Sequence, residues 1–156
     1  LDADALNALS ENMDLLEKRQ GSIILTPHAG ELARLLNTTA KEIQEDRIGA
    51  LKNFSAKYKG ILVLKGAKTL ITDGNEIFIN STGNAALARG GSGDILTGII
   101  VSFLAQKIAP LEAAILGVYL HGLMADCAVK VMDEAGIITE ELIDFISSAF
   151  KEIKMP

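Results

Sequence analysis

The stretch Leu87–Ile100 reads LARGGSGDILTGII, with three glycines around one serine and one aspartate, directly before an apolar run. The first N–H groups of a helix have no partner within the helix, and the helix dipole attracts anions to that end. Glycines have no Cβ, so Gly90, Gly91 and Gly93 let an anion approach the backbone closely. The stretch therefore predicts a helix over about 92–106 whose start can bind a phosphate group.

Asp94 lies inside this anion-binding stretch, where a negative charge needs an explanation. An acid in the first turn of a helix can simply complement the helix dipole, and the motif alone leaves that explanation open. A carboxylate beside a bound phosphate is otherwise unfavourable, unless it takes the proton from a hydroxyl that attacks phosphorus. No Gly-Lys-Ser/Thr follows the glycines, so the stretch is not a Walker loop. Asp94 is thus a candidate catalytic base.

Further towards the N-terminus, two compact apolar runs are typical of strands buried on both faces. These are SIILT at 22–26 and ILVLK at 61–65. The segment 69–80 alternates polar and apolar residues around Asp73-Gly74, which predicts a β-hairpin.

Helical spacing of apolar residues and capping signals predict the helices between and after these strands. Thr39 and Glu42, three residues apart, form a capping box at the start of one of them. The helices are expected over about 6–16, 28–36, 39–58, 92–106, 110–132 and 139–151. Strands alternating with helices predict an α/β fold, with a mostly parallel sheet covered on both faces and one domain over 1–156.

Composition excludes several classes of protein. The chain has 156 residues, of which 49% are hydrophobic, and a net charge of -5 without a Lys/Arg cluster, which argues against a nucleic-acid partner. Cys127 is the single cysteine, so no disulfide forms within the chain. The run 95–105 is too short to span a bilayer, and no signal peptide is visible. We expect a cytoplasmic protein without a membrane partner, and composition leaves a homo-oligomer open.

Three segments follow strand ends or precede a helix, and ligands of such sheets bind at the carboxyl ends of strands. They are TPHAGE at 26–31, KGAKT at 65–69 and the glycine loop at 90–94. We expect them to line one crevice. Lys65 would lie near phosphates there, whereas the side chain of Lys68 is expected to be a solvated charge. His28 is either a functional side chain or a capping and packing residue.

GGSGD at 90–94 resembles the anion-hole and catalytic-aspartate motif of the ribokinase-like superfamily. Together with LTPHAGELARLL, VLKGAKTLI and LGVYLHG, in this order, it makes nearly the whole chain similar to the NAD(P)H-hydrate dehydratases. The resemblance implies a ribokinase-like three-layer α/β/α fold. It also implies ADP-dependent repair of hydrated NADH or NADPH (NADHX, NADPHX). ADP or ATP would be the phosphoryl donor, and Mg²⁺ would come with its phosphates.

The same resemblance assigns roles to individual residues. Asp94 matches the family's catalytic and substrate-contacting aspartate, and His28 its substrate-contacting histidine. Residues matching the nucleotide-binding positions are Lys65, Gly66, Ala67, Lys68, Thr69 and Gly93. The anion hole would be formed by Gly91, Ser92 and Gly93.

One departure from the family pattern concerns length. The family's domain is longer, and LDADALNAL lies near its middle, so the preceding half would supply further strands and a Gly-rich substrate loop. We expect the chain to be a fragment or to receive that half separately. Three functions follow as alternatives: the dehydratase, a ribokinase-like kinase of a small alcohol such as a vitamin precursor, or a non-catalytic half-domain.

Several other polar residues are expected to be structural. His121 and Cys127 lie in an almost wholly apolar helix and are expected in the core. Asp2 and Asp4 look like a metal pair but fit helix capping equally well, and Glu31 is expected to be a helix-dipole partner. His and Cys are too sparse for a structural zinc site, and no metal ligand is assigned.

Overall fold

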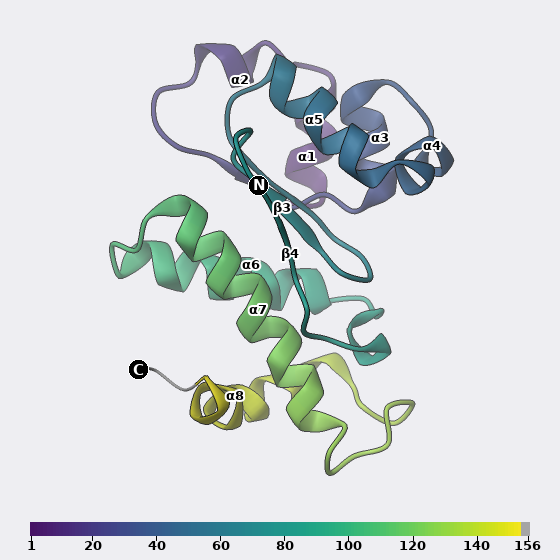
Figure 1. Ribbon diagram of the computed structural model, residues 1–156, viewed down its shortest axis with the longest axis vertical. Coiled ribbons are helices and arrows are strands. Elements are labelled where there is room, and N and C mark those ends of the chain that lie inside the picture. Colours follow the sequence, from purple (N-terminus) through teal and green to yellow (C-terminus); the bar gives the residue numbers. More distant parts are fainter. Residues whose placement is uncertain (154–156) are drawn as a thin grey trace.

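The computed structural model describes residues 1–153, in which a sheet stands between two groups of helices (Figure 1). Within these residues the strand order is β1-β2-β3-β4, formed by Ile24–Leu25, Ile61–Leu64, Leu70–Thr72 and Ile77–Ile79. The pair β1–β2 is parallel, and β3 and β4 follow as antiparallel strands. The α/β class is confirmed, but the sheet of this chain is mixed rather than mostly parallel, because tight turns precede both β3 and β4.

Leu1 extends the parallel side of the sheet. Its amino group donates to the Ile24 carbonyl at 2.7 Å, and its own carbonyl accepts from the Thr26 N–H at 3.0 Å. This is the pattern of a parallel pair, so Leu1 lies along the edge of β1 that faces away from β2.

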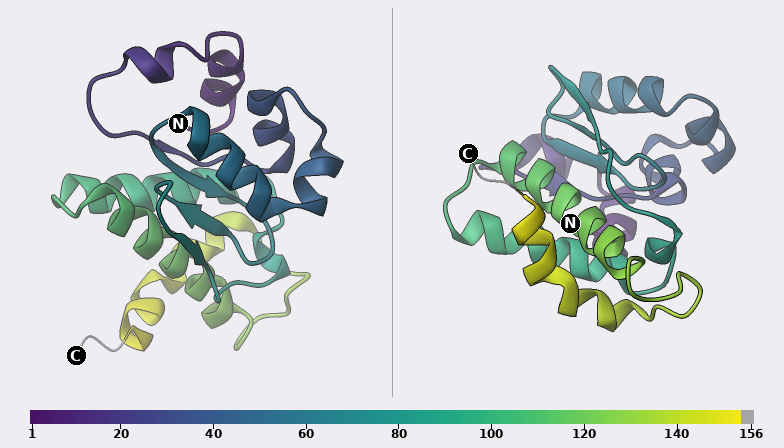
Figure 2. Two further views of the ribbon diagram at one scale, coloured as in Figure 1. Left: turned by 45° about the horizontal axis from the view of Figure 1, so that its top comes forward. Right: turned by 60° about the horizontal axis from the view of Figure 1, so that its bottom comes forward.

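The helices lie on both faces of the sheet and at one end of the molecule. They are α1 Asp4–Ser10, α2 Leu15–Lys18, α3 Ala29–Leu36, α4 Ala40–Glu45, α5 Arg47–Lys57, α6 Ser92–Ala105, α7 Pro110–Ala128 and α8 Ile146–Glu152, with 3₁₀ segments η1 Ala85–Leu87 and η2 Thr139–Phe145. Both further views keep α6 and α7 on one side of the sheet and α3 to α5 on the other (Figure 2). The expected three-layer arrangement is confirmed.

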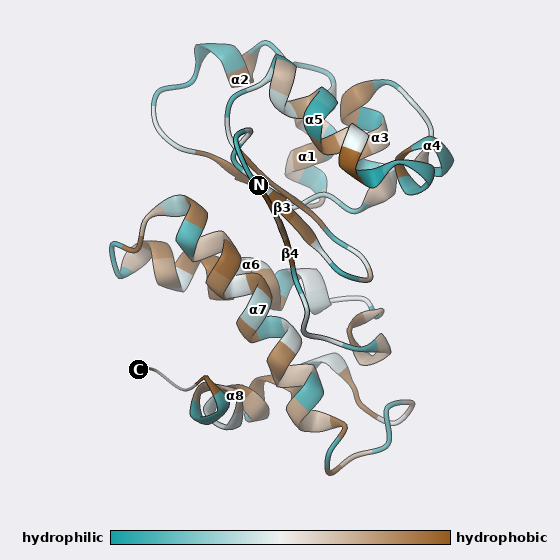
Figure 3. Ribbon diagram, viewed as in Figure 1, coloured by the Kyte–Doolittle hydropathy of each residue, from teal (hydrophilic) through white to brown (hydrophobic). Residues whose placement is uncertain are grey.

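Alternate strand residues serve two separate cores, as the two-residue period of a strand requires. The first core contains Leu25, Leu62 and Leu64 and packs against α1, α3 and α5. The second contains Ile24, Ile61 and Val63 and packs against α6 and α7. The strands are accordingly apolar on both faces, and hydrophilic residues gather on outer helices such as α4 (Figure 3).

The expected single helix over 39–58 is wrong, because the chain breaks at Asp46. The Thr39–Glu42 capping box is present and starts α4. Asp46 then leaves the helical region, with φ of -139°, and its carboxylate accepts from the Gly49 N–H at 2.8 Å. Asp46 therefore caps a second helix, α5. The helix expected over 6–16 is also wrong, because α1 ends at Ser10 and a separate helix, α2, begins at Leu15. In addition, α7 ends at Ala128 rather than 132, and the last helix begins as the 3₁₀ segment η2.

Helix α7 is the central support of the C-terminal half. By length and apolar composition alone it could cross a membrane, but 67% of its most apolar stretch is buried in the protein, where it packs on α6, η2 and α8. Thr82 donates to the carbonyl of Tyr119 at 2.8 Å, and the carboxylate of Asp126 accepts from the N–H of Gly83 at 2.9 Å. The loop before η1 is thereby fixed to α7.

Gly122 is the point of closest approach between α7 and this loop. An ideal Cβ on Gly122 would lie 2.2 Å from Thr82 Oγ1 and 2.7 Å from its carbonyl carbon. Gly122→Ala should therefore destabilise the fold by about 1–3 kcal/mol through overpacking against backbone. Gly98→Ala is the matched control, since it has open space around it on α6; it should stabilise by about 0.5–1 kcal/mol. Urea unfolding measures both, and equal changes in the two variants would contradict the packing argument.

Candidate functional site

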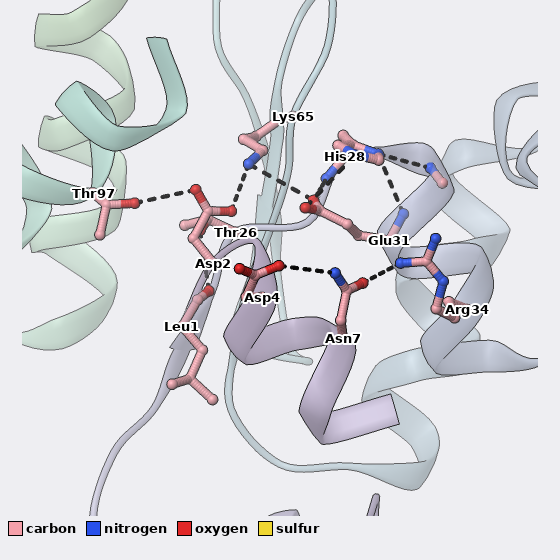
Figure 4. Close-up of polar contacts among 11 residues, drawn as sticks. Leu1, Asp2, Asp4, Asn7, Thr26, His28, Glu31, Arg34, Lys65 and Thr97 are labelled. Atoms are coloured by element: carbon pink, nitrogen blue, oxygen red, sulfur yellow. Dashed lines mark hydrogen bonds and ion pairs between the residues drawn. The ribbon is translucent and has the colours of Figure 1, made fainter. Parts of the chain in front are cut away.

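The ends of β1 and β2 and the start of α6 meet at a polar cluster around Lys65 (Figure 4). We define the Lys65 cluster as Lys65, Asp2, Glu31 and Thr97. Lys65 Nζ lies 2.6 Å from Asp2 Oδ1 and 3.8 Å from Glu31 Oε2, and Thr97 Oγ1 donates to Asp2 Oδ2 at 3.4 Å. The Lys65 N–H also donates to the Pro27 carbonyl at 2.8 Å. The segment after β1 and the segment after β2 therefore lie together beside α6.

The charges of this cluster are largely withdrawn from water. The exposed fractions of the Lys65, Asp2 and Glu31 side chains are 20%, 11% and 9%. One ammonium group therefore serves two carboxylates in a poorly solvated place, where charges are tolerated only when paired. Lys65 is an ion-paired residue of the site rather than a free cation.

Gly93 packs directly against this cluster. An ideal Cβ at Gly93 would lie 3.1 Å from Asp2 Oδ2 and 3.3 Å from Lys65 Nζ. The missing side chain thus lets the ion pair approach the first turn of α6 closely.

The glycine loop presents free backbone donors. Gly91 is the N-cap of α6 with φ of +85°, a conformation that favours glycine. The N–H of Ser92 donates to the Arg89 carbonyl at 3.4 Å, whereas the N–H groups of Gly91 and Gly93 have no intramolecular partner among residues 1–153. These two donors can hold an anion.

The hydroxyl of Ser92 points into the protein. Ser92 is buried, and its Oγ lies 3.3 Å from Nε2 of His121 on α7. Burial lowers the pKa of His121 from 6.5 to about 4, so the imidazole is neutral at pH 7. His121 is a core residue, as expected, and it also supports the loop. The hydroxyl of Ser92 is therefore turned away from the anion donors of the loop.

Asp94 lies in the first turn of α6, next to these donors. It is exposed, and within the described part of the chain its carboxylate accepts no hydrogen bond and forms no ion pair. The group is therefore accessible to a substrate.

His28 is the N-cap of α3, which confirms the capping explanation. Nδ1 accepts from the N–H groups of Gly30 at 3.0 Å and Glu31 at 3.2 Å, and Glu31 Oε2 accepts from the His28 N–H at 2.7 Å. The imidazole is 59% exposed, so capping leaves it accessible. Glu31 lies at the helix start as expected, and in addition it borders Lys65.

Two residues of the site were missed or misassigned from the sequence. Asp2 does not cap α1, whose N-cap is Ala3 without a side-chain hydrogen bond; it is the partner of Lys65. Within residues 1–153 the Asp4 side chain accepts only from Asn7, at 3.5 Å. Arg47 donates to the carbonyl of Leu64, directly before the expected nucleotide segment, and to that of Ala67, within it. No local pattern could reveal these contacts, since Asp2 and Lys65 are 63 residues apart.

Among the described residues, no group of three or more His, Cys, Asp or Glu side chains could hold a metal ion. The carboxylates of Asp2 and Glu31 are already engaged with the ammonium group of Lys65. A Mg²⁺ ion would therefore be held mainly by the phosphates of a bound nucleotide.

The chain resembles known proteins along almost its full length. The pattern of the NAD(P)H-hydrate dehydratase family matches residues 1–147. A bifunctional NAD(P)H-hydrate repair enzyme of Moorella thermoacetica is 43% identical over 99% of this chain and 29% of its own length. An ADP-dependent (S)-NAD(P)H-hydrate dehydratase of Neisseria meningitidis is 44% identical over 99% of this chain and 52% of its own length.

A solved structure shares the fold. It is that of the ADP/ATP-dependent NAD(P)H-hydrate dehydratase of Bacillus subtilis, co-crystallised with ATP and Mg²⁺. It has a TM-score of 0.81 and 36% identity, and the match covers 86% of this chain and 49% of that one. The chain thus spans about half of the single-function relatives and less than a third of the bifunctional one.

The Lys65 cluster makes a prediction about stability. Lys65→Met leaves the poorly solvated carboxylates of Asp2 and Glu31 without their ammonium partner, so the free energy of unfolding should fall by about 2–4 kcal/mol. Lys18→Met is the control, because its ion pair with Asp14 is exposed and should contribute little. Both are measured by urea unfolding at pH 7. An unchanged unfolding midpoint for Lys65→Met would show that the cluster does not hold the segments together.

The buried His121 predicts a pH dependence. Its folded pKa of about 4 lies below the ordinary 6.5, so between these values the unfolded chain binds a proton that the native chain does not. Stability should therefore fall as the pH drops from 6.5 to 4, by about 3 kcal/mol from this group. His121→Gln should remove that part of the dependence, as followed by urea unfolding at several pH values. If the free energy of unfolding depends on pH in the same way for the wild type and for His121→Gln, other groups cause the loss of stability in acid.

Proposed function

Because the chain belongs to the NAD(P)H-hydrate dehydratase family, we propose that it acts in nicotinamide nucleotide repair. Hydrated NADH or NADPH would be converted back to the reduced cofactor, with ADP or ATP as phosphoryl donor. The observation that carries this proposal is the meeting of three segments at the Lys65 cluster, beside the free amides of Gly91 and Gly93 and the exposed Asp94.

The reaction needs a base and a site for a phosphoryl group. Hydroxide is a poor leaving group, so the ring hydroxyl must first be activated. Its oxygen attacks the terminal phosphorus of the nucleotide while Asp94 takes the hydroxyl proton. The new O–P bond forms as the bond to the bridging oxygen breaks, which releases AMP from ADP, or ADP from ATP. The ring C–O bond then breaks, phosphate leaves with the electron pair, and a proton is lost from the neighbouring carbon to restore the double bond.

The remaining residues would bind and orient. The N–H groups of Gly91 and Gly93 face the transferring phosphoryl group as its charge develops. The segment from Lys65 to Thr69 would lie along the nucleotide, and the exposed imidazole of His28 would contact the hydrated cofactor. Mg²⁺, when bound with the phosphates, would neutralise part of their charge.

We further propose that the part of the relatives outside the matched region completes the substrate site, in the same polypeptide or as a separate chain. The nucleotide contacts would then lie mostly in this chain, and the hydrated cofactor would need both parts. Such a repair reaction belongs where reduced nicotinamide nucleotides are used, so we propose a cytoplasmic location.

Asp94→Asn tests the catalytic role. The change keeps the shape but removes the base, so turnover should fall roughly a hundredfold or more. ADP binding should stay similar, since no contact to the anion donors is lost. The assay follows recovery of reduced-nicotinamide absorbance from the hydrate with ADP, using the chain alone and combined with the unmatched half of the Neisseria meningitidis relative.

Glu112→Gln is the matched control, because Glu112 is also an exposed acid in the first turn of a helix, α7. Near-normal turnover of Asp94→Asn would reduce Asp94 to a helix-dipole partner. Accumulation of a stable phosphorylated alcohol instead of reduced cofactor would identify a kinase. Absence of ADP binding in both formats would identify a non-catalytic half-domain.

A further inference from the structure

We propose that Arg47, the first residue of α5, is a positioning residue for the nucleotide. It holds the turn at 65–69 in the shape that the nucleotide contacts, and thereby sets nucleotide affinity without touching the reacting atoms. The inference rests on the proposed function, in which this turn lies along the nucleotide. Nothing in the sequence pattern around Arg47 suggested a role of this kind.

The contacts of Arg47 span the turn. Nη2 donates to the Leu64 carbonyl at 3.2 Å, and Nη1 donates to the Ala67 carbonyl at 2.6 Å. Leu64 is the last residue of β2, and Ala67 is in the middle of the turn. Because the guanidinium is a rigid planar fork, its two donors fix the distance between these carbonyls.

The backbone of the turn needs such support. Gly66 has φ of +144° and Lys68 has φ of +51°, which is unusual for a residue with a side chain. Residues in such conformations persist only where their surroundings hold them. Within the turn, Thr69 Oγ1 donates to the Gly66 carbonyl at 3.0 Å. The guanidinium of Arg47 lies over Gly66, since an ideal Cβ there would be 3.4 Å from Nη2.

The local role of Arg47 in its own helix does not explain its presence. A cation in the first turn of a helix opposes the helix dipole, and the start of α5 is capped by Asp46 instead. Arg47 is half-buried, and this desolvation lowers the pKa of its guanidinium. The helix dipole and desolvation both disfavour the charge of Arg47 at this position, and its hydrogen bonds to the turn offset that cost.

The positive charge of Arg47 differs from that of Lys65 in its partners. Lys65, at the start of the same turn, is paired with two carboxylates. Arg47 forms no ion pair within residues 1–153, because its partners are neutral carbonyls. Its positive charge is therefore available to attract the phosphates of a nucleotide lying along the turn.

The test compares three variants of the full chain by calorimetric titration with ADP. Arg47→Met removes both donors and the charge, and should weaken ADP binding about tenfold or more. Arg47→Lys keeps the charge but cannot bridge both carbonyls, so its affinity should be intermediate. Lys52→Met is the control on the exposed side of α5, and its affinity should equal that of the wild type. In the coupled dehydratase assay, KM for ADP should rise with little change in kcat.

The outcomes separate this inference from the proposed function. Wild-type binding of ADP with unchanged affinity in Arg47→Met would overturn the inference and leave the proposed function intact. A lower unfolding midpoint and lower kcat at constant KM for ADP would assign Arg47 a structural role only, which also overturns it. If Arg47→Met does not fold, Arg47→Lys decides by the same KM criterion. A wild-type chain that binds no ADP, alone or with the relative's half, would remove both proposals together.

Discussion

The ion pair between Lys65 and Asp2 is the contact on which the arrangement of the site depends. It joins residues 63 positions apart at 2.6 Å, and Glu31 and Thr97 attach two further segments to the same place. Because these charges are mostly withdrawn from water, each needs the others to stay paired. The end of β2, the turn before α3 and the start of α6 are therefore held together by electrostatics rather than by the apolar cores alone.

A second set of contacts fixes the glycine loop from the opposite side. The Gly90 carbonyl accepts from Thr139 Oγ1 at 2.8 Å, and Ser92 contacts the neutral His121. Helix α7, which carries His121, approaches the preceding loop so closely that only glycine fits at Gly122. The loop is thus supported by a long buried helix, while the N–H groups of Gly91 and Gly93 have no partner among residues 1–153. Such rigidity is what a site for a developing charge requires, since donors that are already oriented cost no reorganisation.

Three charged residues of the site have different surroundings and therefore different roles. Lys65 neutralises carboxylates inside the site, Arg47 keeps an unpaired charge over the 65–69 turn, and Asp94 remains exposed at the helix start. In the proposed reaction, a base, two anion donors and a nucleotide segment would then lie around one place. The chain spans about half of its single-function relatives, and in the proposed function the other half supplies the wall that faces the hydrated cofactor.

The sequence by itself determined the features that depend on neighbouring residues. The Thr39–Glu42 capping box, the hairpin at Asp73-Gly74 and the helix start at the glycine loop could all be predicted, because each arises from interactions over a few residues. The resemblance of the motifs, taken in order, also indicated the family before any geometry was known. The tertiary structure alone decided that Asp2 pairs with Lys65, that Arg47 holds the 65–69 turn and that Ser92 faces His121. These contacts join distant positions through polar side chains, whose local surroundings fit capping or solvation equally well. Periodicity and spacing describe only neighbouring residues, so they do not predict which distant side chain a charged residue will contact. Only the folded chain shows these contacts.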